Sequence, residues 1–363
     1  MQDLFLELLH VSIGRRYSLS RVPSANEWRG LYALAQKQAV AGVCFCGVQR
    51  LTKEQRDSLP ELLRMQWLAL ATQIQARNEL MNRRCGGLQQ MFASKGMRSC
   101  ILKGQGVAAL YSERLQPLRQ SGDIDVWVDA SREQVIDFVM GIAPTKEFDQ
   151  KHIHFHVFDD VEVEAHWIPV NRESPKFNRI LGKYFEKERN RQFSHGKDAL
   201  CVPTTDFQLV HQLLHTYGHY VYEGVGLRQL MDLYFTQKAF VESIPEKKEE
   251  VLMLFKRLGL MKFVAGTQYV LHEVFAMEID YLIYSPDEKE GRLLLKEIET
   301  GGNFGQYDVR NNVKDESFFH RALRRFERRW HMVRFDPLGT ILMPFNRARL
   351  EVWMRTVRRK YRV

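Results

Sequence analysis

The chain has 363 residues, of which 45% are hydrophobic and 27% are charged, and its formal net charge is +9 at pH 7. This length exceeds what one small core accommodates, so we expect two or three substructures. No apolar run approaches the length of a membrane span, and the N-terminus lacks the basic and then apolar order of a signal peptide, so we expect neither feature.

The five cysteines indicate the redox conditions of the cellular compartment in which the protein resides. Their number is odd, and Cys44 and Cys46 are too close in sequence for a relaxed disulfide. Burial as small hydrophobic side chains accounts for all five. We therefore expect a reducing, cytoplasmic location.

Residues 1–95 predict an N-terminal helical region. Ser24 and Glu27 fit a capping box at the start of one helix. Pro60 is expected to begin a long helix with a single apolar stripe. The stripe comprises Leu63, Trp67, Leu70, Ile74 and Leu80. We interpret these helices as scaffold.

A strand is expected over residues 97–102, followed by a turn at Lys103 and Gly104 and a helix from Gln105. A small residue between a strand and a helix lets backbone N–H groups approach an anion, and the helix N-terminus adds its positive dipole end. Lys103 adds a mobile positive charge. Alone, the pattern is typical of an ordinary turn, but before a pair of acidic residues it predicts a phosphate site.

That acidic pair is Asp123 and Asp125, which flank Ile124 at the start of an apolar run. Because side chains alternate along a strand, both carboxylates face one side while Ile124 enters the core. Two like charges side by side are unfavourable unless a positive group lies between them. Pairs of divalent metal ions fill this role in phosphoryl and nucleotidyl displacement. The segment predicts a nucleotide-using enzyme.

Residues 152–157 and 161–167 alternate apolar and polar side chains and predict a hairpin. A two-residue loop would place Phe155 opposite Glu164 and mix apolar with charged side chains. An odd-numbered loop gives one apolar face and one polar face, so we expect this second register. Glu164 is then the expected third metal ligand, with Glu162 as the alternative.

His152, His154 and His156 lie on the polar face of this hairpin in the expected register. Neutral imidazoles at alternate strand positions converge and are able to bind zinc. Zinc sites usually draw ligands from more than one element, however, and no Cys lies near in sequence. We therefore expect these histidines to line a polar cleft, where they contact phosphate or orient the acidic residues, or to lie at the surface.

After the hairpin, a helical region begins. A helix from Asp206 carries His211, His215 and His219 four residues apart on one side, and Gly218 is expected to end it. We expect this side to face the cleft, with His215 contacting the base or the substrate.

Arg228 and Asp232 are also four residues apart and are expected to pair, bracing the helices against the sheet. Arg228 alternatively faces a triphosphate.

Residues 321–363 contain thirteen Arg or Lys and three acidic residues, a net charge of about +10, so the remainder is close to neutral. Aromatic side chains are interleaved with the basic ones. We interpret the segment first as helix with a solvated basic face, then as a surface for RNA or an acidic partner, and last for an anionic membrane. Pro337 and Pro344 predict that it is not one continuous helix.

Taken in order, these segments resemble the bacterial family of uncharacterised nucleotidyltransferases within the superfamily built on the DNA polymerase β fold. The matching residues are Ile101-Leu102-Lys103-Gly104, Arg119, Asp123-Ile124-Asp125, Val163-Glu164-Ala165-His166-Trp167, His215, Leu227-Arg228 with Asp232, and Gly301-Gly302-Asn303-Phe304-Gly305. The resemblance implies that Asp123, Asp125 and Glu164 hold two Mg²⁺ ions, and that Lys103 and Gly104 contact the nucleotide phosphates. The family pattern has Asp where this chain has Glu164.

These features predict an α+β fold, with a small mixed β-sheet of polymerase β type flanked by N-terminal and C-terminal helical regions. The expected divisions are residues 1–95, a catalytic core at 96–170, a helical domain at 171–300 and a basic segment at 301–363. The predicted activity is metal-dependent transfer of a nucleoside monophosphate from an NTP to a small-molecule, protein or RNA acceptor. Arg119, with Lys103 and Gly104, is expected to neutralise the pyrophosphate. The alternative is a catalytically degenerate protein that binds nucleotide or RNA on the same fold.

Overall fold

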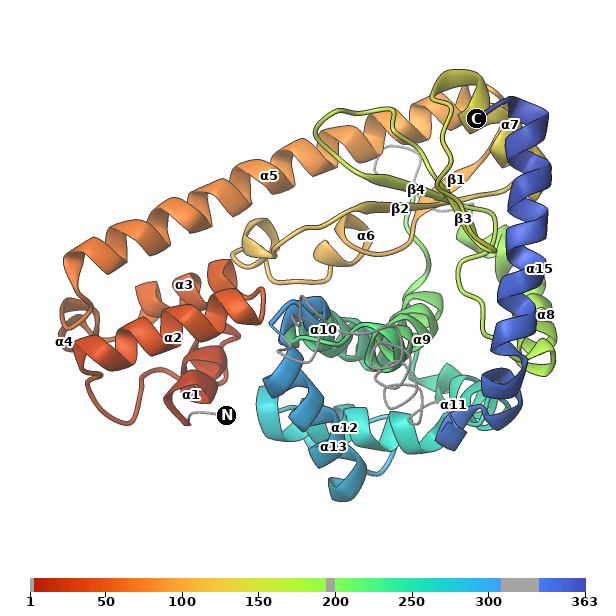
Figure 1. The fold of residues 1–363 in the computed structure, drawn as a ribbon. Coiled ribbons are helices and arrows are strands. Elements are labelled where there is room, and N and C mark those ends of the chain that lie inside the picture. Colours follow the sequence, from red (N-terminus) through yellow and green to blue (C-terminus); the bar gives the residue numbers. More distant parts are fainter. Residues whose placement is uncertain (1–2, 194–199, 308–332) are drawn as a thin grey trace, which may run out of the picture.

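The structure is a computed structural model that describes residues 3–193, 200–307 and 333–363. A small sheet lies between the long helix α5 (Glu61–Ala93) and a set of helices that follow it in the chain (Figure 1). This arrangement confirms the expected α+β class with helical regions on either side of the sheet.

The sheet has four strands in the order β1-β2-β4-β3. They are β1 (Ser99–Ile101), β2 (Ile124–Val128), β3 (His152–His154) and β4 (Val163–His166). The central pair β2 and β4 is parallel, while β1 and β3 pair antiparallel with their neighbours. The predicted mixed sheet is therefore confirmed, and its parallel centre places residues of β2 and β4 side by side.

The hairpin of β3 and β4 has the register that the odd-numbered loop predicts. Ile153 pairs with Ala165 and His154 pairs with Glu164. Since successive side chains alternate faces, the apolar side of the hairpin enters the core and the polar side carries the histidines and Glu164.

Each face of the sheet packs against helices. On one face, apolar side chains of β2 and β4 form a core with α5 and α7 (Arg132–Ile142). On the other, Trp127 stacks on Phe207 with ring centroids 5.4 Å apart. Asp125 lies two residues before Trp127, so the same face is apolar at one end and acidic at the other.

The N-terminal helices share their core with the helices that follow the sheet. The first set comprises α1 (Asp3–Ser12), α2 (Ala25–Lys37), α3 (Ala41–Arg50) and α4 (Lys53–Asp57). Ser24 caps α2 through the predicted capping box with Glu27, and Pro60 is the N-cap of α5. One continuous cluster of buried residues then joins these helices to those beyond residue 205.

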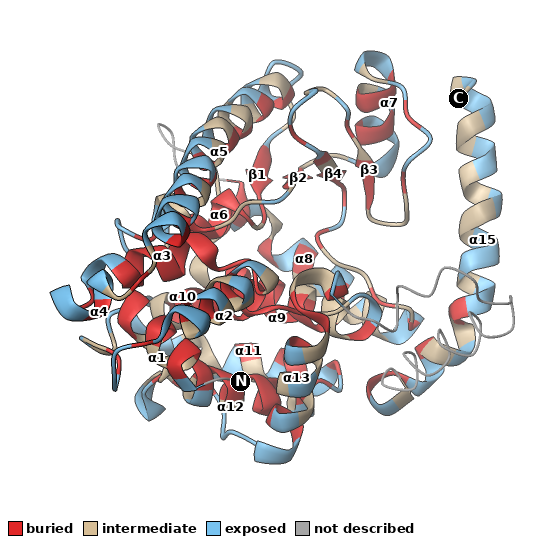
Figure 2. Cartoon of the chain, turned by 60° about the vertical axis from the view of Figure 1, so that its left-hand side comes forward, coloured by how far each residue is buried: buried red, intermediate tan, exposed pale blue. Residues whose placement is uncertain are grey.

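The later helices form the base of the molecule, and α9 and α10 are its most deeply buried members (Figure 2). The set comprises α8 (Pro175–Gln192), α9 (Thr205–Tyr222), α10 (Leu227–Ser243), α11 (Lys248–Arg257), α12 (Met261–Phe275) and α13 (Glu288–Gly301). The expected end of α9 at Gly218 is wrong, because a single glycine inside a helix costs only about 1 kcal/mol. The helix therefore continues and carries His219 one turn beyond His215.

Helix α15 (Pro337–Tyr361) runs along the sheet, and the expected break at Pro344 is wrong. Pro337 lies in the first turn, where a backbone N–H needs no partner. Beyond Pro344, Trp353 and Val357 pack on the core of the sheet and hold the helix in place. Residues 308–332 of the predicted basic segment lie outside the described residues. None of the described helices is long and apolar enough to cross a membrane.

Candidate functional site

The predicted acidic residues meet at the centre of the sheet. Asp123 immediately precedes β2, Asp125 lies within it, and Asp125 is the direct partner of Glu164 in the parallel pairing of β2 with β4. Glu162, the alternative ligand, precedes β4 and is exposed, and it lines a cavity that also borders Asp123 and Asp125. The register thus brings Glu164, not Glu162, opposite Asp125.

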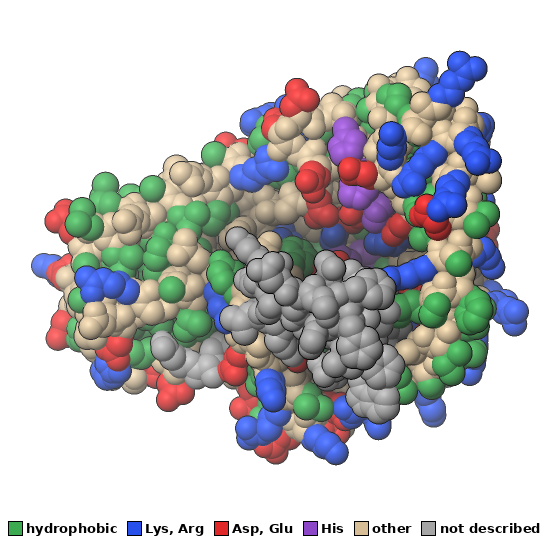
Figure 3. Space-filling model, in the orientation of Figure 1, with side chains coloured by type: hydrophobic (Ala, Val, Ile, Leu, Met, Phe, Trp, Pro, Cys, Tyr) green, Lys and Arg blue, Asp and Glu red, His purple; other side chains and the backbone are tan. Residues whose placement is uncertain are grey.

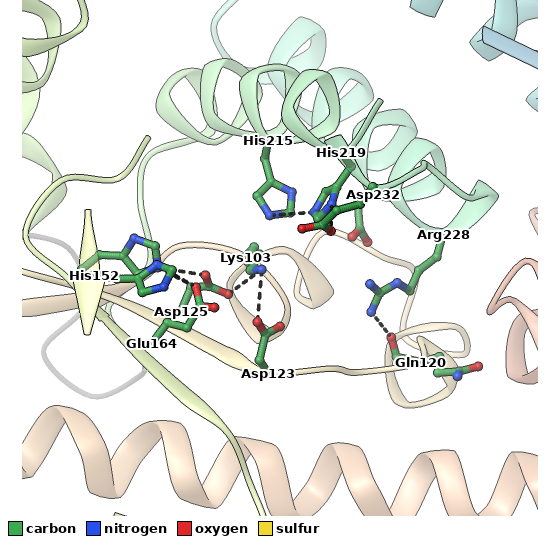
Figure 4. A network of polar contacts seen from close by, with 12 residues as sticks. Lys103, Gln120, Asp123, Asp125, His152, Glu164, His215, His219, Arg228 and Asp232 are labelled. Atoms are coloured by element: carbon green, nitrogen blue, oxygen red, sulfur yellow. Dashed lines mark hydrogen bonds and ion pairs between the residues drawn. The ribbon is translucent and has the colours of Figure 1, made fainter. Parts of the chain in front are cut away.

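Lys103 lies between the first two carboxylates (Figure 4). Its Nζ atom is 2.9 Å from Asp125 Oδ2 and 3.4 Å from Asp123 Oδ2. An ammonium at this point relieves the repulsion that two neighbouring carboxylates would otherwise suffer. The lysine therefore acts as an internal counter-ion for the acidic pair.

Gly104 allows the chain to turn directly after this lysine. Its φ is +60°, a conformation that side chains other than glycine rarely adopt. The helix that follows, α6 (Gln105–Ala108), has only four residues, so it is shorter than the sequence suggested and brings only a small dipole. An anion at this segment would therefore be bound by the Lys103 charge and the backbone of the turn, and not by a helix terminus.

His166, which was not among the predicted site residues, joins the acidic cluster from β4. Its Nε2 atom is 3.0 Å from Asp125 Oδ1 and 3.2 Å from Glu164 Oε2, and its side chain is 2% exposed. Asp125 therefore has Lys103 on one oxygen and His166 on the other. The available signal was the alternation of β4, which puts His166 on the face of Glu164.

The surroundings favour the ionised forms of Asp123 and Glu164. Burial alone would raise the pKa of Asp123, but the Lys103 ammonium lowers it below its ordinary value. Burial likewise opposes ionisation of Glu164, yet the hydrogen bond with His166 leaves the pKa of Glu164 well below its usual range. Burial lowers the pKa of His166. Two ionised carboxylates, those of Asp123 and Glu164, thus lie in one cluster with the imidazole of His166.

This donor set fits a divalent cation. One ligand atom from each of Asp125, Glu164 and His166 lies within 4.8 Å of the others. Asp125 Oδ2 is buried and accepts no hydrogen bond of regular geometry from the residues that the structure describes. Carboxylate oxygens are the ligands that Mg²⁺ prefers. Asp123 extends the set toward Lys103.

A cavity of about 680 Å³ opens beside the carboxylates. Lys103, Asp123 and Glu164 line it on the sheet side, while Arg347 and Leu350 of α15 close another side. Acidic and histidine side chains gather over the sheet on this face of the molecule (Figure 3). The volume falls within the range of about 300 to 1,000 Å³ that small-molecule sites occupy.

Helix α9 forms the wall opposite the sheet, as the sequence predicted for its histidine stripe. His215 Nε2 lies 3.2 Å from His219 Nε2, and the His219 ring lies 4.7 Å from that of Phe304. Burial and the nearby Lys103 charge hold the pKa of His215 well below its ordinary value. A neutral His215 is therefore available as a hydrogen-bonding group above the carboxylates.

The pairing of the buried arginines differs from the prediction. Asp232 does not pair with Arg228, its neighbour in sequence, because Arg119 donates to both Asp232 oxygens at 2.7 Å and Tyr111 donates to one of them at 2.7 Å. Arg119 is thereby committed to a buried ion pair. This ion pair braces the loop before β2 against α10, while the expected role of Arg119 at the pyrophosphate stays a prediction.

Arg228 borders the same small pocket as Arg119. It donates to the carbonyl of Gln120 at 3.1 Å and lines a small pocket together with Lys103, Gly104 and Asp123. Burial and the neighbouring Arg119 lower the pKa of Arg228 to about 10, so it remains positively charged at neutral pH. Its charge thus lies beside the turn that follows β1.

Comparison with known proteins gives one positive result. Residues 24–276, more than half of the chain, match a family model described as uncharacterised nucleotidyltransferase. No curated protein and no solved structure matches the chain. The matched range includes β1 to β4, α9 and α10, and therefore every site residue described above except those of α15 and Phe304.

Proposed function

The chain belongs to the uncharacterised nucleotidyltransferase family, and we propose that its nucleotidyl transfer takes place at the carboxylates of β2 and β4. The donor is an NTP, the acceptor oxygen forms a bond to the α-phosphorus, and the bond to the β-phosphate oxygen breaks with release of pyrophosphate. The observation that carries this proposal is the pairing of Asp125 with Glu164 across parallel strands, with Lys103 beside them at the cavity. We further propose that the sheet is of the DNA polymerase β type.

Asp123, Asp125 and Glu164 would hold two Mg²⁺ ions. When bound, such ions polarise the phosphate and stabilise the attacking and leaving oxygens. The buried Asp125 is held by two strands and by His166, so its oxygens have fixed positions. Preorganised ligands of this kind cost little rearrangement during reaction.

Lys103 and Gly104 would contact the triphosphate, with Arg228 at its far end. Lys103 carries its charge on a flexible stem, and its side chain already borders the cavity. It is therefore able to turn from the carboxylates to the leaving pyrophosphate, whose negative charge grows as the bond breaks.

Glu164 would take the proton of the acceptor hydroxyl, directly or through water. Its ionised state at neutral pH suits this role, and His166 keeps the carboxylate oriented. His215 faces the acids from α9 and would contact the base or the sugar (Figure 4).

The test is a double substitution, Asp123→Asn with Asp125→Asn. We expect pyrophosphate release from ATP, GTP, CTP and UTP with Mg²⁺ to fall by at least about 1,000-fold, since the ions would lose most of their ligands. The assay uses water as the slow acceptor, and a labelled α-phosphate follows transfer to small molecules and to RNA. Full activity in the double variant, with circular dichroism unchanged, would refute the proposed site.

A second candidate is a protein that binds a nucleotide without turning it over. It is favoured by the position of Lys103, which already neutralises Asp123 and Asp125 from within the chain. Tight ATP binding by calorimetry, with no pyrophosphate released for any acceptor, would select this candidate over the first.

A further inference from the structure

The polar face of the hairpin carries imidazoles that the proposed reaction does not use. His152 and His154 lie on β3 and face the same side, and His154 is the direct strand partner of Glu164 on β4. One ligand atom from each of these three residues lies within 4.8 Å of the others. Zinc sites usually draw ligands from more than one element, and here β3 supplies the two histidines while β4 supplies Glu164.

His152 has a nitrogen that lacks a satisfactory partner. Its side chain is only 9% exposed, and Nδ1 finds no hydrogen bond among the described residues. That nitrogen nevertheless lies 3.1 Å from Glu164 Oε2. Two ligands about 2.0 to 2.1 Å from a tetrahedral zinc ion are about 3.3 Å apart, so this separation is close to that of a coordinated pair.

We propose that His152, His154 and Glu164 form a binding site for a transition-metal ion such as Zn²⁺. Two imidazoles and one carboxylate are a common zinc ligand set, and they leave a fourth position for water or substrate. Imidazole nitrogen selects such ions over Mg²⁺, which prefers oxygen ligands.

Glu164 belongs to both this histidine site and the proposed magnesium site. Zinc on the His152 side would compete for its oxygens and thereby slow magnesium-dependent turnover. This consequence rests on the proposed function, whereas zinc binding itself does not. The histidine site would make the enzyme sensitive to the concentration of free zinc.

The first experiment measures binding without nucleotide. Zn²⁺ is titrated calorimetrically into the full chain in excess Mg²⁺, and Co²⁺ is added as a spectroscopic probe of coordination. We expect one ion per chain, with the visible absorption of low-coordinate cobalt. Substitution His154→Gln should weaken zinc binding by at least about 100-fold, since even residues outside the ligand set contribute about 10- to 100-fold.

His156→Gln is the matched control, because His156 lies two residues further on the same face but is half-exposed and outside the cluster. It should bind zinc as the unchanged chain does. His154 is partly exposed, so its substitution should leave the core undisturbed. The experiment therefore does not depend on His152→Gln, a buried substitution that could prevent folding.

Equal zinc affinity in the His154→Gln variant and the unchanged chain would overturn the proposal. Loss of zinc in Asp125→Asn but not in His154→Gln would also overturn it, because the ion would then occupy the cluster with His166. A chain that binds zinc through His154 but releases no pyrophosphate would support this site and contradict the proposed function instead. An active enzyme that does not bind zinc would overturn the histidine site alone.

Discussion

At the scale of single residues, the site is organised around the two oxygens of Asp125. Oδ1 contacts His166 at 3.0 Å and Oδ2 contacts Lys103 at 2.9 Å. A carboxylate that is buried without such partners would be protonated or would destabilise the fold. The same contacts mean that any incoming cation competes with Lys103.

Replacing Lys103 by Met tests this competition. The variant should bind Mg²⁺ more tightly than the unchanged chain when nucleotide is absent, because Asp123 and Asp125 lose their internal counter-ion. Its turnover should nevertheless fall, by about 100-fold, because the variant lacks the charge that we propose to neutralise the pyrophosphate. Thermal unfolding with and without Mg²⁺ measures the first effect, and pyrophosphate release measures the second.

Lys183→Met, an exposed position on α8, is the control. Unchanged Mg²⁺ affinity in the Lys103 variant would mean that the lysine does not occupy the cation position.

At the scale of elements, charged contacts fix the helices around the sheet. Asp206 lies in the first turn of α9, where it meets Arg191 of α8 at 3.1 Å and Lys247 at 2.5 Å. Although burial opposes ionisation, these partners lower the pKa of Asp206 to about 2. One carboxylate thus links α9, the wall of the cavity, to α8 and to the start of α11 (Lys248–Arg257).

This contact gives stability a defined pH dependence. The folded-state pKa of Asp206 lies below its unfolded value, so its contribution is complete above about pH 4 and is lost as the pH falls toward 2. Asp206→Asn should lower the free energy of unfolding by about 1 to 2 kcal/mol at pH 7 and by progressively less below pH 4. Urea titrations at pH 7, 5 and 3.5 measure it.

Asp280→Asn, an exposed site outside these ion pairs, provides the control. A deficit in the Asp206 variant that is equally large at pH 3.5 would contradict the assignment.

The sequence predicts correctly those features that depend on local patterns, and it misses those that depend on contacts between residues far apart in the chain. The hairpin register was predictable because a slip of one residue would bury Glu164 and expose Phe155. The pairing of Asp232 was not, because Arg119 is 113 residues away while Arg228 is four away. The three hydrogen bonds that Asp232 accepts from Tyr111 and Arg119 therefore decide its partner, although Arg228 is nearer in sequence. Similarly, α15 continues through Pro344 because its contacts with the sheet core hold it, and no local pattern reveals them.

At the scale of the whole molecule, one buried tie connects the sheet to the helical base. Arg119 precedes β2, Asp232 lies on α10, and Tyr111 completes the set between them. All three are buried, so the charges cannot be satisfied by water if one partner is removed. The tie therefore fixes the loop before β2 against α10.

Asp232→Asn should lower the free energy of unfolding by about 3 to 5 kcal/mol, the usual cost of leaving a buried charge without its partner. The triple variant Tyr111→Phe, Arg119→Met and Asp232→Leu should recover most of that loss, because it removes every polar member of the tie. Chemical denaturation of both variants makes the comparison. A loss below about 1 kcal/mol in the single variant would contradict the bracing role of this ion pair.

The cleft draws its walls from distant parts of the chain, from Lys103 through α9 to Arg347 and Leu350. Because synthesis proceeds from the N-terminus, the carboxylates and Lys103 leave the ribosome long before α15 does. A nascent chain therefore exposes its acidic cluster while one side of the pocket is still missing. If this cavity binds the nucleotide as we propose, binding should begin only when α15 has emerged, because the pocket lacks one side until then.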